Sequence, residues 1–155
     1  MVEIDIMETK KIVNTITINA PIDKVWNVLV NPQQTKKYMF GCEALSDWKK
    51  GSELIWKMLY EGKDFIPVKG HIKNIEQPNL LEYTTFDPHS TIPDVPQNYL
   101  TVTYELKSIN DSTELKVSQG DYNTVAEGKR RYEEAYNDGK GWDPILVEIK
   151  KVAEE

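Results

Sequence analysis

The feature that most constrains this chain is an amphipathic helix that the sequence predicts over residues 141–152. Asp143 can cap this helix, and Pro144 suits its first turn, where a backbone N–H has no helical partner. Apolar residues then follow the i, i+3, i+4 spacing that places side chains on one helix face: Trp142, Ile145, Leu146, Ile149 and Val152. Such a stripe must lie on an apolar surface, which the rest of the chain has to supply.

The remaining patterns predict a sheet. Alternating apolar residues bounded by turn signals predict strands at residues 11–19, 54–60, 65–76, 80–86, 98–108 and 113–117. Consecutive strands joined by short turns indicate an antiparallel meander with one apolar and one solvated face.

Three other helices are predicted. One begins at residues 20–23 and ends at Asn31-Pro32, and a shorter helical piece follows around residues 34–39. Thr124 and Glu127 have the capping-box spacing, which predicts a helix from there to about Tyr136. The elements together predict an α+β fold in one domain over residues 1–155, with helices on one face of an antiparallel sheet.

Composition excludes several classes of protein. The formal net charge is −6, and no stretch concentrates enough Lys and Arg to bind nucleic acid. Cys42 is the only cysteine, so an intramolecular disulfide and a multi-cysteine zinc site are excluded. Residues 1–11 lack the apolar core of a signal peptide, and no segment is long enough to span a membrane. These observations predict a soluble cytoplasmic protein.

Several short motifs resemble, in order, those of a known superfamily. Residues 17–26 are similar to the first strand and helix of the START-like (SRPBCC) helix-grip superfamily. Residues 46–52, 70–72 and 78–83 resemble the middle of its branch related to the activator of Hsp90 ATPase (AHSA1-like), and Gly141-Trp142 with residues 145–150 resembles the closing helix of that branch.

This resemblance implies a curved antiparallel sheet of about six or seven strands wrapped around a long C-terminal helix, with two small helices after the first strand. It also implies a cavity for an apolar or amphipathic small molecule. Some members of the superfamily catalyse cyclisation or dehydration there, whereas co-chaperone members of this branch bind Hsp90. The charged segment 122–140 is longer than usual in the branch and fits a lid, a partner surface or a surface insertion.

Two sets of residues are candidates for a binding site. The first set would line the cavity as a group, although ordinary core packing is the favoured interpretation of each member taken singly: Trp56, Met58, Val102, Tyr104, Trp142, Leu146 and Ile149. The second set belongs to the proline-rich loop 87–97, which fits either a cavity entrance or a rigid crossover between two strands: His89, Ile92 and Val95.

The sequence gives little support for catalysis. His71 is expected to face solvent, and the spacing of Asp87, His89 and Asp94 matches no metal-ligand pattern. Cys42 lacks an evident base, and there is no glycine-rich phosphate loop. We therefore predict no catalytic residue, no metal and no cofactor.

The leading interpretation is a non-enzymatic protein that binds an apolar or aromatic small molecule, lipid-like or polyketide-like, between the sheet and the C-terminal helix. The first alternative is a module that binds and regulates an Hsp90-type chaperone. The second is an enzyme of the cyclase or dehydratase type that uses the same cavity.

Overall fold

An antiparallel sheet dominates the computed structural model, which describes residues 9–155. Most of the amino-terminal stretch considered above for a signal peptide lies outside these residues. Within them the sheet has seven strands in the spatial order β1-β7-β6-β5-β4-β3-β2. The strands are β1 (Ile12–Ile18), β2 (Glu43–Ser46), β3 (Glu53–Tyr60), β4 (Lys63–Glu76), β5 (Leu80–Thr85), β6 (Leu100–Ile109) and β7 (Ser112–Gly120). The predicted α+β class and antiparallel meander are confirmed.

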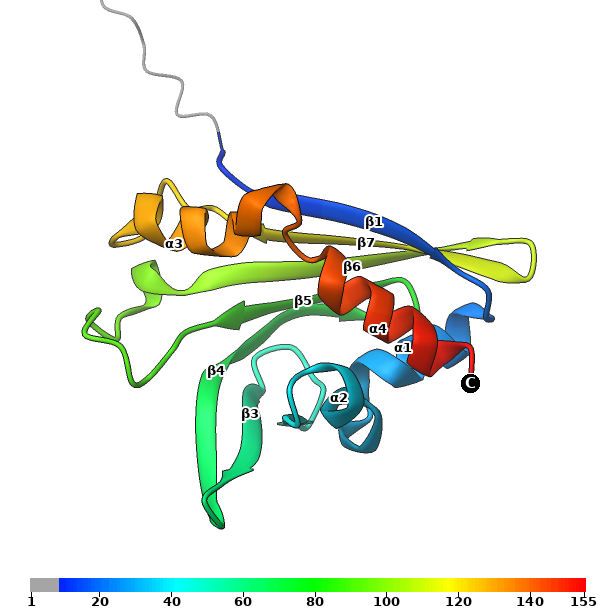
Figure 1. The fold of residues 1–155 in the computed structure, drawn as a ribbon, viewed down its shortest axis with the longest axis horizontal. Helices are drawn as coiled ribbons and strands as arrows, with labels where there is room; N and C mark the ends of the chain where they lie inside the picture. Colours follow the sequence, from blue (N-terminus) through cyan, green and yellow to red (C-terminus); the bar gives the residue numbers. More distant parts are fainter. Residues whose placement is uncertain (1–8) are drawn as a thin grey trace, which may run out of the picture.

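The sheet is bent along β4, its longest strand. Residues 63–71 of β4 pair with β3, whereas residues 72–76 pair with β5. Register shifts fall between Trp56 and Met58 and between Ile72 and Asn74, and such bulges bend a strand and increase its twist. In Figure 1 the β3–β4 hairpin accordingly turns away from the long strands β5, β6 and β7.

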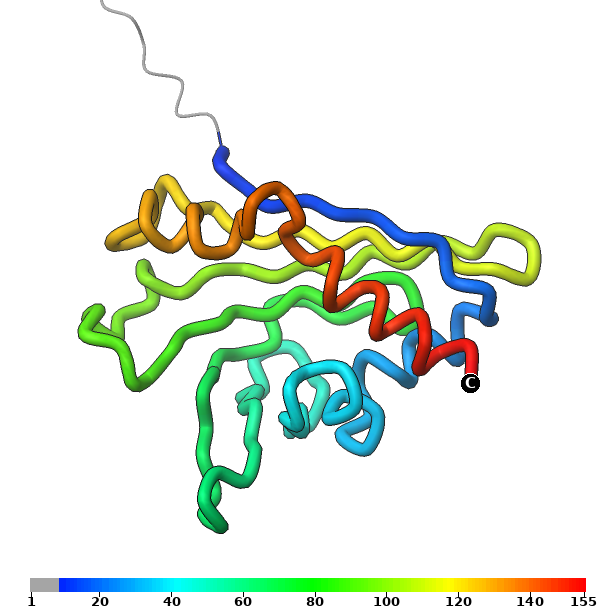
Figure 2. The backbone as a smooth tube through the Cα atoms, in the orientation of Figure 1, coloured from blue at the N-terminus to red at the C-terminus, as the bar shows by residue number. Residues whose placement is uncertain are grey.

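Four α-helices accompany the sheet in the described residues: α1 (Ile22–Val30), α2 (Pro32–Tyr38), α3 (Gly128–Tyr136) and α4 (Asp143–Ala153). Short 3₁₀ turns lie at Pro96–Asn98 and Asn137–Gly139. The two helices predicted after the first strand are confirmed, and the Asn31 side chain caps α2 by accepting from Gln33 N–H at 2.9 Å. The trace in Figure 2 shows α4 running diagonally from α3 toward α1. None of these helices is long and apolar enough to cross a membrane.

Helix α4 buries the stripe that its sequence predicts. Leu146, Ile149 and Ala153 are fully buried, and Val152 is nearly so. The helix packs against β1, α1 and α2. Full burial of such side chains contributes about 1.5–3 kcal/mol each, so the C-terminal helix is a main part of the core.

The start of α4 differs from the prediction that Asp143 caps it. Trp142 holds the cap position and makes no side-chain cap, and Asp143 is already helical. The capping group comes from β1, because Asn14 Oδ1 accepts from Trp142 N–H at 2.9 Å. Asn14 Nδ2 donates to Asp143 Oδ1 at 3.0 Å and to the Lys140 carbonyl at 3.3 Å. A residue distant in sequence therefore ties the helix to the sheet.

The capping-box prediction for α3 is wrong. Thr124 Oγ1 donates to the Asp121 carbonyl at 2.9 Å, and the helix begins only at Gly128. The intervening turn is held by tertiary packing: Tyr122 and Val125 are buried, and a Cβ on residue 128 would lie 1.8 Å from the Tyr122 carbonyl oxygen. Local sequence could not show this close approach, so the helix starts three residues later than its pattern suggests.

Candidate functional site

A cavity of about 490 Å³ lies between the sheet and the junction of α3 with α4. Most of its wall is apolar. Strands β3 to β7 contribute Trp56, Met58, Pro67, Val68, Tyr83, Thr85, Val102 and Gln119; the turn after α2 contributes Met39, Phe40 and Cys42; and the α3–α4 region contributes Glu134, Ala135, Asn137, Gly141, Trp142 and Ile145.

The structure divides the predicted lining residues into two groups. Trp56, Met58, Val102 and Trp142 line the cavity. The other three do not, because each is at most 1% exposed and packs in the core: Tyr104, Leu146 and Ile149. The first turn of α4 thus faces the cavity with Trp142 and Ile145, and the following turns rest on the core.

Gln119 fixes the tryptophan in the cavity wall. The Trp142 indole Nε1–H donates to Gln119 Oε1 at 3.0 Å. The Tyr104 ring also contacts the indole in an edge-to-face arrangement, with the centroids of the two rings 6.0 Å apart and their planes at 88°. Gln119 was not identified as a site residue from the sequence. The alternation on β7 could have indicated it, because Gln119 is the next residue on the face that buries Thr113, Leu115 and Val117.

Two tyrosines form a polar pair beneath the cavity, and of the two only Tyr83 lines it. The hydroxyl oxygens of Tyr83 and Tyr104 lie 3.2 Å apart, and both side chains are buried. Burial, followed by the neighbouring Tyr104, raises the pKa of Tyr83 well above its ordinary value, and burial also raises the pKa of Tyr104. Both hydroxyls therefore remain protonated and act as neutral hydrogen-bonding groups.

The loop 87–97 contributes no residue to the lining of this cavity. His89, Ile92 and Val95 are all absent from the lining, so the cavity lends no support to an entrance position of the loop. Phe40, which is 78% exposed, lines the cavity together with the exposed residues Glu134 and Asn137. The outer part of the cavity therefore lies between the turn after α2 and the end of α3.

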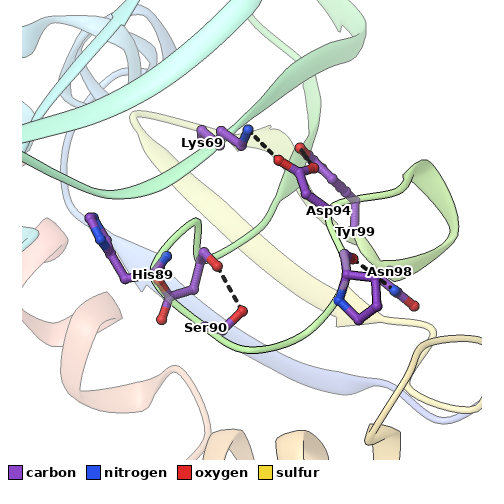
Figure 3. A network of polar contacts seen from close by, with 8 residues as sticks. Lys69, His89, Ser90, Asp94, Asn98 and Tyr99 are labelled. Atoms are coloured by element: carbon purple, nitrogen blue, oxygen red, sulfur yellow. Dashed lines mark hydrogen bonds and ion pairs between the residues drawn. The ribbon is translucent and has the colours of Figure 1, made fainter.

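Polar contacts hold that loop against β4, as Figure 3 shows. Lys69 Nζ binds Asp94 Oδ2 at 2.5 Å, and the Tyr99 hydroxyl donates to Asp94 Oδ1 at 2.6 Å. His89 Nε2 donates to the Ile66 carbonyl at 3.0 Å, with its ring stacked on Phe65. The hydrogen bond from Lys69 is the main cause that lowers the pKa of Asp94. These contacts support the interpretation of the loop as a rigid connection between β5 and β6.

The remaining chemical candidates have structural positions. His71 is exposed on β4, as predicted. Cys42 is buried in the cavity wall, and burial raises the pKa of its thiol. Asp87, His89 and Asp94 do not converge, and residues 9–155 contain no group of three or more His, Cys, Asp or Glu side chains that could hold a metal ion.

One family model matches the sequence over most of its length. The model of the family described as "Activator of Hsp90 ATPase homolog 1-like protein" matches residues 19–154. A solution structure of a Cytophaga hutchinsonii protein is 37% identical, with a TM-score of 0.68, over 96% of this chain and 97% of that chain. No curated protein matches the sequence.

More distant structures share the fold. A crystal structure of a Nitrosomonas europaea protein has a TM-score of 0.70 at 19% identity, over 94% of this chain and 95% of that chain. The structure of an HSP90 activator from Plasmodium falciparum has a TM-score of 0.65 at 18% identity, over 94% of this chain and 96% of that chain.

Proposed function

Since the chain belongs to the family of activator of Hsp90 ATPase homolog 1-like proteins, an AHSA1-like branch of the SRPBCC fold, we propose that it is a non-enzymatic protein that binds an apolar or aromatic small molecule. The cavity between the sheet and the α3–α4 junction carries this proposal. Its volume of about 490 Å³ lies within the range of about 300–1,000 Å³ that is typical of small-molecule sites. Its mostly apolar wall with a few fixed polar groups also suits such a ligand.

The chemistry of the wall favours binding over catalysis. A general acid or base near neutral pH needs a pKa close to that pH. The cavity residues Tyr83 and Cys42 have their pKa values moved upward by burial, so both stay protonated. Glu134 lies in the outer part of the cavity and binds Arg130 Nη1 at 2.9 Å. These features support the binding proposal over the cyclase or dehydratase alternative.

A cavity-blocking substitution tests this proposal. Val68 lines the cavity and is half-buried, whereas Val13 lies on β1 and is 51% exposed. The neutral fluorescent probe N-phenyl-1-naphthylamine should bind the wild type at a single site. Val68→Trp should remove that binding, and the matched Val13→Trp should retain it. Equal probe binding by both variants, or none by the wild type, would contradict the proposal.

A second candidate function is regulation of an Hsp90-type chaperone. The family supports it, and so do three exposed apolar side chains: Phe40 at 78%, Leu59 at 70% and Tyr60 at 58% exposed. Leu59 and Tyr60 lie at the end of β3 beyond its pairing with β2, so this part of the strand edge is open. The charged α3 is a weaker candidate for this surface, because Arg130 already binds Glu127 and Glu134 within it.

The chaperone function is tested by the ATPase rate of purified Hsp90. Stimulation by the wild type that Leu59→Ser reduces, and that Val68→Trp leaves intact, would support an interaction separate from the cavity. No change in rate with the wild type would remove this candidate.

A further inference from the structure

The polar groups of the cavity wall restrict the chemistry of the ligand. We propose that the cavity selects an uncharged apolar molecule that carries a hydrogen-bond-accepting oxygen, such as the carbonyl of a ketone, ester or amide, and that Gln119 binds this oxygen through its side-chain amide. This inference rests on the proposed binding function and adds the class of ligand.

The orientation of the Gln119 amide follows from its partner. An indole N–H is only a donor, so the atom 3.0 Å from Trp142 Nε1 must be the oxygen of the amide. The Oε1 atom is therefore engaged within the fold. The Nε2 hydrogens have no other bonded partner within residues 9–155, and Gln119 lines the cavity. A ligand in the cavity thus meets an oriented amide donor.

The position of Gln119 in the sheet is well defined. Tyr83, Val102 and Gln119 occupy one row across β5, β6 and β7, because Val102 pairs with Tyr83 on one side and with Gln119 on the other. All three line the cavity. Neighbouring strands of a sheet are hydrogen-bonded about 4.8 Å apart, so their relative positions are fixed. The Gln119 amide is therefore held by a rigid element, which favours a fixed ligand orientation.

The tyrosine pair offers a second donor in the same row. The hydroxyls of Tyr83 and Tyr104 carry two protons but share one hydrogen bond, of 3.2 Å. A ligand oxygen next to Tyr83 would complete a chain in which Tyr104 donates to Tyr83 and Tyr83 donates to the ligand. Leaving a buried donor unpaired is costly, so an acceptor is the favoured ligand group at this wall.

The charges around the cavity exclude an anionic ligand. Among the lining residues of the described chain, Glu134 is the only Asp or Glu, and no Lys, Arg or His is present. A ligand carboxylate would lie in an apolar cavity without a cationic partner, which is strongly unfavourable. A neutral carbonyl accepts from Gln119 without this cost.

Three probes of similar shape separate these chemistries. Benzophenone carries a ketone, diphenylmethane lacks the oxygen, and diphenylacetate is an anion. A single neutral hydrogen bond contributes about a 3- to 10-fold difference in affinity. By titration with each probe, the wild type should bind benzophenone about 3- to 10-fold more tightly than diphenylmethane, and diphenylacetate most weakly.

The variant Gln119→Glu isolates the donor. Its carboxylate still accepts from the Trp142 indole but offers no N–H to the ligand. The preference for benzophenone over diphenylmethane should therefore disappear, while the Trp142 indole N–H of the free protein stays hydrogen-bonded and its resonance moves downfield, because a charged acceptor forms a stronger hydrogen bond. Gln97→Glu adds the same charge at an exposed site and should retain the preference.

The outcomes distinguish this inference from the function on which it rests. If benzophenone and diphenylmethane bind the wild type equally, or if the preference survives in Gln119→Glu, the selectivity is overturned and cavity binding stands. If diphenylacetate binds as tightly as benzophenone, the charge argument is overturned. If none of the probes binds while N-phenyl-1-naphthylamine does, the selectivity also fails; if that probe fails too, the proposed function itself is contradicted.

Discussion

Replacement of Gly141 by alanine tests how the C-terminal helix is attached to the sheet. Gly141 has φ +51°, and a Cβ there would lie 2.5 Å from Asn14 Oδ1 and 2.8 Å from Ile12 Cγ2. The Asn14 side chain would have to move, which breaks its hydrogen bonds to Trp142 N–H and to Asp143 Oδ1. Alanine would thus both strain the backbone and remove the group that caps α4.

The expected loss has two parts. The left-handed conformation costs alanine about 1 kcal/mol relative to glycine, and two lost hydrogen bonds cost about 1 kcal/mol each. Gly141→Ala should therefore lower the free energy of unfolding by about 3 kcal/mol. Gly139→Ala is the matched control, since Gly139 has φ +88° but its added Cβ would meet nothing closer than 3.6 Å. It should cost only about 1 kcal/mol.

Urea unfolding measures this difference. With a slope of about 2 kcal/mol per molar urea, the midpoint of Gly141→Ala should lie about 1 M below that of Gly139→Ala. In the background of Asn14→Ala the capping bonds are already absent, so Gly141→Ala should cost only about 1 kcal/mol more. The reasoning is refuted if the two glycine variants unfold at the same urea concentration, or if the effects of Gly141→Ala and Asn14→Ala simply add.

Three further predictions concern other polar groups. Tyr122 Oη is buried without a hydrogen-bond partner in the described structure, and burial raises the pKa of Tyr122 to about 12. In urea unfolding, Tyr122→Phe should therefore be as stable as the wild type or up to about 1 kcal/mol more stable, and should lack the stability loss that this tyrosine causes as the pH rises from about 10 to 12; a marked loss at neutral pH would show a hidden partner. The pKa of Asp94 is lowered by Lys69, so its contribution is present above the ordinary aspartate pKa and is lost as the pH falls through the lowered value. As the pH falls through that value, backbone amide exchange in loop 87–97 should lose protection in the wild type but not in Asp94→Asn. Identical pH profiles of protection in the two proteins would argue against the ion pair. Thr35 Oγ1 accepts from the buried Ala44 N–H at 2.9 Å, so Thr35→Val should cost about 1–3 kcal/mol and Thr35→Ser much less; equal losses in the melting temperature would reject this role.

The sequence predicted the elements whose burial follows a regular period. Strands β1 and β6 alternate between buried and exposed positions, and the predicted strands at residues 11–19 and 98–108 coincide with them to within about two residues. The order of elements then determined the fold class, because short connections leave few topologies for an antiparallel sheet.

Contacts between distant residues could not be predicted in this way. Asn14 lies 128 positions from Trp142, and its polar side chain on a strand gives no local sign that it caps a helix. The late start of α3 depends likewise on the approach of Gly128 to the Tyr122 carbonyl. Local capping signals therefore failed where tertiary contacts supply the hydrogen bonds.

The division between cavity and core was also beyond sequence reasoning. Trp142, Leu146 and Ile149 belong to one helical stripe, yet only Trp142 lines the cavity. The difference depends on where the bent sheet and the helix separate, which the apolar pattern does not encode. The packing of loop 87–97 was hidden for a similar reason, since its contacts with Lys69 and Ile66 on β4 are not local.

The central claim is that the cavity is the ligand site, and the four tryptophans of the chain allow a direct test. Trp56 and Trp142 line the cavity, whereas Trp26 and Trp48 do not. We predict that titration with benzophenone, followed in the ¹H–¹⁵N spectrum, moves the indole resonances of Trp56 and Trp142 and leaves those of Trp26 and Trp48 in place. Saturable shifts of Trp26 or Trp48 alone, or no shift of any indole, would contradict the account.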